Sequence, residues 1–225
     1  MAKDMTLLWG AGSPPCWRVM IVLEEKGLQG YKEERLYFEK MEQKSQKVLD
    51  WNPRGQLPTF KFGDKCLNES YAACMYLENH FKSQGNKLIP DDENEVALMY
   101  QRMMEGINLT QKSGDVIYYD WKVPEGERHD SAVKRNKENL TTEVKLWEGY
   151  LKKVQGGYLA GKTFSLADVI VYPSICYLFY FGLCEKKYPK LACYYNRLRE
   201  RPSIKATWPP NWLENSKGGD ILKDI

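Results

Sequence analysis

The sequence has little histidine: only His80 and His129 occur among its 225 residues. A metal site built on imidazole ligands, or a serine–histidine–aspartate triad, would therefore have few residues to draw on. The sequence also lacks closely spaced cysteines, because no two of its six cysteines form a C-x-x-C pair. This spacing argues against a dithiol redox motif and against a compact zinc cluster. We expect the cysteines to be reduced and mostly structural.

Long apolar runs and a strong charge of one sign are missing as well. No apolar stretch is long enough to span a membrane, and the first residues, MAKDMTLLWG, do not resemble a secretory signal. The formal net charge is only +3, so a nucleic-acid partner is not expected. With 43% hydrophobic residues the chain can bury a substantial core. These features predict a cytoplasmic protein that binds neither a membrane nor a nucleic acid.

The first part of the chain alternates short apolar runs with helical patterns. The expected elements are strands at 5–9 and 31–38, helices at 17–27, 42–52 and 70–81, and two short strands within 56–70. The last two strands flank Gly63 and Asp64, which together form a two-residue hairpin signal. The order β-α-β-α-β-β-α predicts a small α/β sheet with an antiparallel end.

The rest of the chain is predicted to be helical. A polar stretch at 82–94, which contains Gly85 and Pro90, has the composition of an interdomain connection. The helices expected beyond it cover 93–119, 131–153, 166–183 and 187–199. We therefore expect an α/β domain at 1–84, a linker at 85–92 and an all-helical domain at 93–225.

The very apolar helix in the second half is preceded by a capping signal. Ser165 and Asp168 have the S-x-x-D spacing of a capping box, in which side chains satisfy free N–H groups at a helix start. We expect both residues to be structural and neither to be catalytic.

Four short motifs occur in order along the chain. They are SPPC at 13–16, NPRGQLPTF at 52–60, NES at 68–70 and GKTFSLADV at 161–169. Together with the α/β and helical halves, they make the chain resemble a cytosolic glutathione S-transferase over essentially its whole length. The SPPC turn is similar to those of the serine-type theta and delta classes, and CWRV at 16–19 is similar to the zeta class. The segments DVIYYDWKVPEGERHD and RPSIKATWPPNWLEN are most similar to the rho class of aquatic animals.

The resemblance implies a fold and an activity. The fold would be a thioredoxin-like glutathione-binding domain followed by an all-helical domain that contributes the electrophile site. The protein would be a cytoplasmic homodimer that conjugates the glutathione thiolate to small hydrophobic electrophiles in detoxification and xenobiotic metabolism. Glutathione would be a co-substrate, and no metal or organic cofactor is implied.

Ser13 is the candidate catalytic residue. The thiol of glutathione is largely protonated at neutral pH, whereas the thiolate is the nucleophile. Lowering its pKa by about two units requires about 2.7 kcal/mol of selective anion stabilisation. One charge-assisted hydrogen bond supplies most of this, and a helix N-terminus adds to it. Ser13 matches the serine that activates glutathione in theta- and delta-like relatives; the alternative is that Ser13 is only a helix N-cap.

Cys16 is the alternative reactive residue. At the first turn of a helix its thiol would also be activated, and a cysteine performs thiol–disulfide exchange in the omega class of the family. In that class, however, the cysteine occupies the position of Ser13. We expect Cys16 to be a buried structural residue, and glutathione-dependent thiol–disulfide exchange stays the alternative function.

The segment around Leu57 and Pro58 is expected to bind the middle of glutathione. In the family the residue before this proline pairs its backbone with the cysteinyl group, and the proline is cis. An ordinary trans proline that opens an edge strand is the alternative. Gln56 and Gln43 match positions with polar or basic groups at the glycyl and backbone-amide end of glutathione.

Glu69 and Ser70 are expected to bind the γ-glutamyl end. In the family the matching acidic residue faces the ammonium group, while the serine hydroxyl and the helix N-terminus face the carboxylate. Ser70 is also expected to cap a helix that begins at Tyr71, and capping alone is the alternative role.

The electrophile site is expected in the helical half. Met104, Ile107, Tyr118 and Trp212 are the candidates, because aromatic and apolar side chains suit flat, apolar electrophiles. A role in the core is the alternative for such side chains. Since family-like folds also serve as assembly modules or ligand carriers, a non-catalytic carrier is a third possible function.

Overall fold

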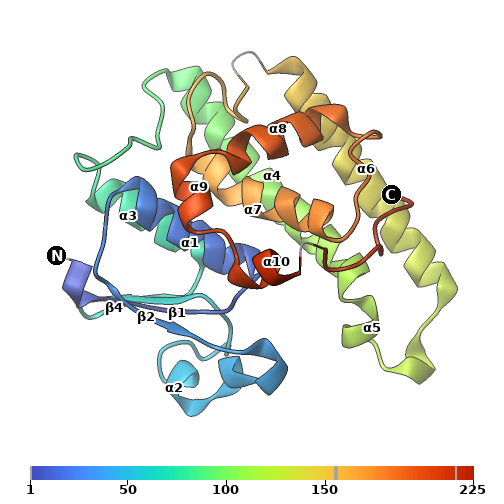
Figure 1. Ribbon diagram of the computed structural model, residues 1–225, viewed down its shortest axis with the longest axis horizontal. Helices are drawn as coiled ribbons and strands as arrows, with labels where there is room; N and C mark the ends of the chain where they lie inside the picture. Colours follow the sequence, from blue (N-terminus) through green and yellow to red (C-terminus); the bar gives the residue numbers. More distant parts are fainter. Residues whose placement is uncertain (1, 155–156, 216) are drawn as a thin grey trace. The chain divides into compact units, whose positions relative to one another are not determined.

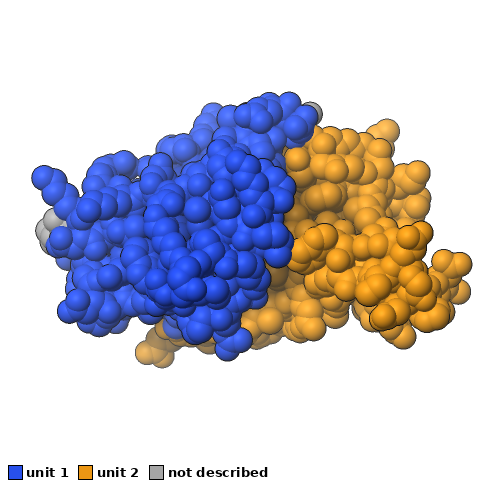
Figure 2. Space-filling view, turned by 90° about the horizontal axis from the view of Figure 1, so that it is seen from below, with its two compact units in different colours: residues 1–89, 201–215 blue, residues 90–200, 216–225 orange. Residues whose placement is uncertain are grey.

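The computed structural model describes residues 2–154, 157–215 and 217–225 (Figure 1). They form two compact units, which are coloured separately in Figure 2. The first unit consists of Met1–Ile89 and Arg201–Asn215, and the second of Pro90–Glu200 and Ser216–Ile225. The domain limits expected from the sequence stay a prediction. The structure adds that 201–215, which was expected in the helical domain, belongs to the first unit.

The first unit is built on a four-stranded sheet. Its strands are β1 (Met5–Trp9), β2 (Lys32–Arg35), β3 (Thr59–Phe62) and β4 (Lys65–Leu67), in the order β2-β1-β3-β4. β1 pairs in parallel with β2 and antiparallel with β3, which pairs antiparallel with β4. Leu7 of β1 pairs with Phe60 of β3, and both are fully buried. The β-α-β-α-β-β-α order of a thioredoxin-like domain is confirmed.

Three helices complete this part of the chain. They are α1 (Pro14–Glu25), α2 (Gln46–Leu49) and α3 (Ser70–His80), with 3₁₀ turns η1 (Ala2–Asp4), η2 (Phe38–Lys40) and η3 (Glu42–Lys44). α1 and α3 pack together over one face of the sheet (Figure 1). The helix expected at 42–52 is shorter than predicted. In α2 only Val48 is buried, so little apolar contact supports a longer helix there.

The connection after α3 is tied to the end of α1. At Gly85, which has φ +61°, an added Cβ would lie 2.3 Å from the Glu25 carbonyl oxygen. Lys26 is fully buried, and its Nζ donates to the Asn86 carbonyl oxygen at 2.8 Å and pairs with Glu78 at 2.5 Å. The Leu88 N–H donates to the same glutamate at 3.1 Å. Residues 85–88 are therefore held by buried polar contacts, although their composition is that of a linker.

Two short helices that the sequence did not predict lie in the C-terminal part of the first unit. They are α9 (Pro202–Ala206) and α10 (Pro210–Glu214), and each has a proline in its first turn. α9 packs against α1, where Arg201 Nε and Nη2 donate to the Glu25 carboxylate at 2.6 and 2.7 Å. Ser203 Oγ donates to the same carboxylate. This buried ion pair anchors 201–215 to α1.

The second unit is helical, as expected. Its helices are α4 (Glu93–Ile117), α5 (Tyr119–Lys122), α6 (Asp130–Lys153), α7 (Leu166–Tyr180) and α8 (Pro189–Arg199), with the 3₁₀ turn η4 (Glu125–Glu127). α7 is the central helix, because it packs against both α4 and α8 and buries nearly all of its side chains. Across the described ranges, no helix combines the length and the apolar character that a membrane span requires.

The capping box at the start of α7 is confirmed. The Asp168 carboxylate is fully buried and accepts hydrogen bonds from the Ser165 N–H at 2.9 Å and from the Leu159 N–H at 3.0 Å. The Tyr194 hydroxyl donates to it as well, at 2.9 Å. Ser165 and Asp168 therefore connect α7 to α8 and to the preceding loop, which is a structural role.

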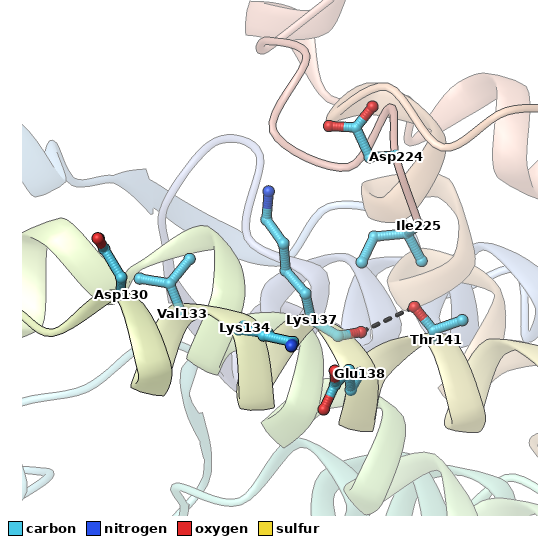
Figure 3. Close-up of a pocket in the computed structure, with 8 residues that line it drawn as sticks. All are labelled: Asp130, Val133, Lys134, Lys137, Glu138, Thr141, Asp224 and Ile225. Carbon is cyan, nitrogen blue, oxygen red and sulfur yellow. Dashed lines mark hydrogen bonds between the residues drawn. The ribbon is translucent and has the colours of Figure 1, made fainter.

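The C-terminal residues return to the second unit. The Leu222 N–H donates to the Phe181 carbonyl oxygen at 3.0 Å, and both Leu222 and Ile225 are buried. Figure 3 shows Ile225 over the face of α6 that carries Val133, Lys137 and Thr141. These side chains line a cavity of about 430 Å³. None of the residues expected to bind glutathione or an electrophile is among those that line it.

Candidate functional site

Ser13 is the N-cap of α1. Its backbone is extended (φ −84°, ψ 114°), and its Oγ accepts a hydrogen bond from the Cys16 N–H at 3.5 Å. Pro14 and Pro15 occupy the first turn, where their missing N–H groups leave no intrahelical bond unmade. The capping role of Ser13 is therefore present. It does not exclude a second role, because a hydroxyl that accepts one bond still has its own proton to donate.

Cys16 is enclosed in the packing below this turn. Its side chain is 1% exposed, and its Sγ accepts a hydrogen bond from the Gly10 N–H at 3.4 Å. Burial raises the pKa of the Cys16 thiol to about 11, although hydrogen bonds from Ser13 and Gly10 and the charge of Arg18 act in the opposite direction. At neutral pH this cysteine is therefore a protonated, inaccessible thiol. The geometry matches the structural role expected for it.

The Leu57–Pro58 peptide bond is cis, as expected. Leu57 is buried at 7% exposure, two residues before β3. Among the hydrogen bonds of the described residues, none uses the main-chain N–H or C=O of Leu57. Both groups are thus available to pair with an extended peptide. The glutathione contact itself stays a prediction.

Glu69 and Ser70 lie where β4 leads into α3. The N-cap of α3 is Glu69, and Ser70 is the first helical residue, so the expectation that Ser70 caps a helix starting at Tyr71 is wrong by one position. Ser70 Oγ accepts a hydrogen bond from Arg18 Nη1 at 3.2 Å. Because this bond holds the oxygen of Ser70, the hydroxyl proton remains free to donate toward a carboxylate.

Arg18, for which the sequence predicts no role, lies beside the candidate residue Ser70. It lies in α1, is 2% exposed, and its guanidinium lies 5.0 Å from the centre of the Tyr71 ring. Burial lowers the pKa of this guanidinium, against the opposing charge of Tyr71. Arg18 brings a cation to the start of α3. Because 52 positions separate it from Ser70, helical or strand periodicity could not have paired the two residues.

The two glutamines differ in their surroundings. Gln43, in η3, is 8% exposed; its Nε2 donates to Met41 Sδ at 3.4 Å, and its buried Oε1 has no hydrogen-bond partner. Gln56 is exposed, and its main-chain oxygen accepts bonds from Asn52 Nδ2 at 2.8 Å and Thr59 Oγ1 at 3.1 Å. The main chain before Leu57 is therefore fixed from two sides.

Three of the four candidates for the electrophile site belong to the second unit. Met104 and Ile107 lie one turn apart on α4 and are 48% and 49% exposed. Tyr118 follows α4, and its hydroxyl shares a hydrogen bond with that of Tyr177. Partial burial raises the pKa of Tyr118, while the bond with Tyr177 acts in the opposite direction. Exposed apolar side chains on one helix face can contact an apolar ligand.

Trp212 differs from these three because it belongs to the first unit. It is 5% exposed and packs edge-to-face against Trp17, with ring centres 5.6 Å apart. This packing is the core role that was the alternative for such aromatics. Its place in the electrophile site stays a prediction.

Comparisons with known proteins agree with this architecture. A model described as the glutathione S-transferase N-terminal domain matches residues 12–80, and one described as the C-terminal domain matches residues 108–208. Glutathione S-transferase A of Pleuronectes platessa is 71% identical over 225 residues, 100% of both chains.

Solved structures give the same result. A glutathione S-transferase from the Antarctic clam Laternula elliptica is 38% identical, covers 99% of this chain and 100% of its own, and has a TM-score of 0.86. A glutathione transferase from Phanerochaete chrysosporium, solved in complex with oxidized glutathione, is 28% identical over 92% of this chain and 95% of its own, with a TM-score of 0.78. The motifs, the two units and these full-length similarities together show that the chain belongs to the glutathione S-transferase family.

Proposed function

We propose that this chain conjugates the glutathione thiolate to small hydrophobic electrophiles, with Ser13 as the residue that stabilises the thiolate. The observation that carries the proposal is the position of Ser13 at the N-cap of the 12-residue helix α1. Its oxygen accepts from the Cys16 N–H, and its rotatable O–H, which is also within reach of the Cys16 thiol, can turn to donate to the sulfur of bound glutathione. The helix N-terminus adds partial positive charge near the same point. Both effects favour the thiolate over the thiol.

Glutathione binding is assigned to the first unit. The free main-chain groups of Leu57, followed by Pro58, would pair with the cysteinyl portion. Glu69 would face the ammonium group of the γ-glutamyl end, and Ser70 would donate to its carboxylate. Arg18 supports this assignment, because it holds the Ser70 oxygen as an acceptor. Gln43 and Gln56 would contact the glycyl end and the backbone amides.

The electrophile would contact Met104, Ile107, Tyr118 and Trp212. The reaction is nucleophilic addition or aromatic substitution by the thiolate, which is accelerated by thiol ionisation and by proximity. The chemistry requires glutathione as co-substrate and neither a metal nor an organic cofactor. The physiological role is detoxification.

The class, the assembly and the location are proposed from the resemblance to the family. We assign the chain to the rho class, which the similarity of the segments DVIYYDWKVPEGERHD and RPSIKATWPPNWLEN to that class supports. The protein is a homodimer with two-fold symmetry, and it acts in the cytoplasm.

A conjugation assay tests the proposal. With a chromogenic aryl halide, the purified protein should form product only when glutathione is present, at a rate proportional to protein concentration. Isothermal titration with glutathione gives the matching binding measurement. Binding without turnover of aryl halides, enones or epoxides would contradict the proposal and favour a carrier.

Replacing Cys16 with serine should leave conjugation nearly unchanged. The buried thiol, with its pKa of about 11, takes no part in the chemistry, and serine keeps an acceptor for the Gly10 N–H. The measurement is kcat/KM for the aryl halide, together with reduction of a mixed glutathione disulfide. If Cys16→Ser abolished a disulfide-reductase activity of the unmodified protein, the oxidoreductase alternative would be favoured instead.

A further inference from the structure

The turn that carries Ser13 is in contact with a distant part of the chain. Gly12 has φ +74°, and a Cβ added to it would lie 2.7 Å from Asn211 Nδ2 and 3.0 Å from Trp212 Nε1. Both residues belong to α10, in the same unit as Gly12. α10 therefore packs directly on the residue before Ser13. The backbone conformation favours glycine there, and an added Cβ would also displace the Asn211 amide.

α10 is held in this position by a cluster of tryptophans. The Trp17 ring meets those of Trp212 and Trp208 edge-to-face, with centres 5.6 and 5.1 Å apart. Trp17 Nε1 also donates to Thr207 Oγ1 at 2.8 Å, and this hydroxyl donates to the Ser203 carbonyl oxygen at 2.7 Å. Together with the buried Glu25–Arg201 pair described above, these contacts fix the segment along α1. α10 is thus a rigid support rather than a loose tail.

Asn211 makes its contact with the turn by packing. No hydrogen bond among the described residues uses its side-chain amide, and its Oδ1 is buried without a partner. Its neighbour Leu213 is 72% exposed, which shows that α10 directs one side chain to the turn and another to solvent. The contact of Asn211 with Gly12 is therefore one of shape and volume.

We propose that Asn211 is a positioning residue for Ser13. By filling the space beside Gly12, its side chain fixes the turn and with it the direction in which the Ser13 hydroxyl donates. A hydrogen bond weakens steeply as its distance grows and its angle departs from linearity. A small movement of the turn would therefore weaken the bond from Ser13 to the sulfur, which stabilises the thiolate less and raises the pKa of the bound thiol. This inference rests on the proposed role of Ser13 in glutathione activation.

Replacing Asn211 with alanine tests the role. The readout is the pKa of the bound glutathione thiol, titrated by the ultraviolet absorbance of the thiolate, together with kcat and KM. We expect Asn211→Ala to raise this pKa by about one unit. At pH values below the pKa, the thiolate fraction should then be about tenfold lower. KM for glutathione should change little. Leu213→Ala on the same helix is the control and should leave the pKa unchanged.

The variant Asn211→Leu shows whether an effect of Asn211→Ala comes from the lost side-chain shape or from a loss of folding. Leucine has a similar branched shape, and the amide makes no hydrogen bond, so leucine should restore the thiol pKa to within a few tenths of the unmodified value. Thermal unfolding of each variant shows whether the fold is intact. If Asn211→Leu behaves like Asn211→Ala while both remain folded, or if Asn211→Ala leaves the pKa unchanged, the positioning role is wrong.

A glycine pair gives an independent test with a matched control. Gly12 and Gly30 both have positive φ, +74° and +79°, but a Cβ at Gly30 would meet nothing within 4 Å. Alanine at either position has a similar backbone cost, and only Gly12→Ala collides with α10. We expect Gly12→Ala to raise the thiol pKa and Gly30→Ala to leave it unchanged. Combining Gly12→Ala with Asn211→Ala should reverse part of the pKa increase caused by Gly12→Ala, because the smaller side chain at 211 makes room for the new methyl group. If Gly12→Ala and Gly30→Ala changed the thiol pKa equally, the inference would be overturned.

The thiol pKa in the unmodified protein separates the proposed role of Ser13 from that of Asn211. If the protein binds glutathione without lowering the thiol pKa, the proposed role of Ser13 fails and this inference fails with it. If it lowers the pKa and Asn211→Ala lowers it equally, only the role of Asn211 is lost.

Discussion

Replacing Ser13 with alanine should lower kcat/KM for glutathione conjugation about a hundredfold at neutral pH. Alanine removes the only side-chain donor proposed for the sulfur, and with it most of a stabilisation of about 2.7 kcal/mol. The acid limb of the kcat profile should move upward by about two pH units, because that limb reports the thiol pKa in the complex. Stopped-flow titration of the bound thiolate measures the same shift directly.

Two variants control this experiment. Ser13→Thr keeps the hydroxyl and should retain a substantial part of the activity, whereas Cys16→Ser should retain nearly all of it. The loss in Ser13→Ala also has a structural component, since Ser13 caps α1 and an N-cap contributes about 1 kcal/mol of stability. Urea unfolding measures that component separately. An unchanged acid limb in a folded Ser13→Ala variant would exclude the proposed mechanism.

Replacing Glu25 with glutamine should destabilise the protein by about 3 kcal/mol at neutral pH. The Glu25 carboxylate is 3% exposed and accepts hydrogen bonds from Arg201, Ser203 and Asn86, the last at 2.8 Å. Glutamine keeps the size of the side chain but leaves the guanidinium of Arg201 without its counter-charge. The guanidinium is partly exposed, which places the loss at the lower end of the range for buried pairs.

The pH dependence of this effect has a definite sign. Burial alone would raise the pKa of Glu25, but the hydrogen bonds from Arg201, Ser203 and Asn86 and the charge of Arg201 hold it below its ordinary value of 4.5. Its contribution is therefore complete above about pH 4.5 and decreases as the pH falls through the folded-state pKa. The difference between Glu25→Gln and the unmodified protein should shrink in the same range.

Glu24 provides the matched control. It precedes Glu25 on the same helix and is only partly buried, and its carboxylate accepts a hydrogen bond from the exposed Gln29 side chain at 2.9 Å. Glu24→Gln makes the same change in charge and should cost less than 1 kcal/mol. Denaturant unfolding at neutral pH and near pH 4 gives both comparisons. Equal losses for the two variants would contradict the role of the buried pair.

Much of the first unit could be predicted from the sequence because its signals are local. The apolar run at 5–9 became β1, and the turn at Gly63 joins β3 to β4 as expected. The capping box at Ser165 also depends only on neighbours in sequence, and it is confirmed. Each of these patterns is contained within a few residues, so composition and spacing determine it.

The features that could not be predicted depend on contacts between distant residues. α9 and α10 are five residues each and rich in proline, too short for helical periodicity, and they form because Trp17 and Glu25 provide a surface for them. The Arg18–Ser70 hydrogen bond joins two elements that only the folded sheet brings together. The assignment of the cap of α3 to Ser70 was wrong because Glu69 and Ser70 are adjacent and both can begin a helix.

The attachment of residues 85–88 to α1 has a consequence for protein engineering. A polar, glycine-containing connection between two compact units would ordinarily be chosen for inserted sequences, for new chain ends in a circular permutant or for protease cleavage. Here Gly85 contacts main-chain atoms of Glu25 and Lys26, and Leu88 is 1% exposed, so an insertion would break a buried network. The exposed turn at Gly63 and Asp64 is a better place to open or lengthen this chain.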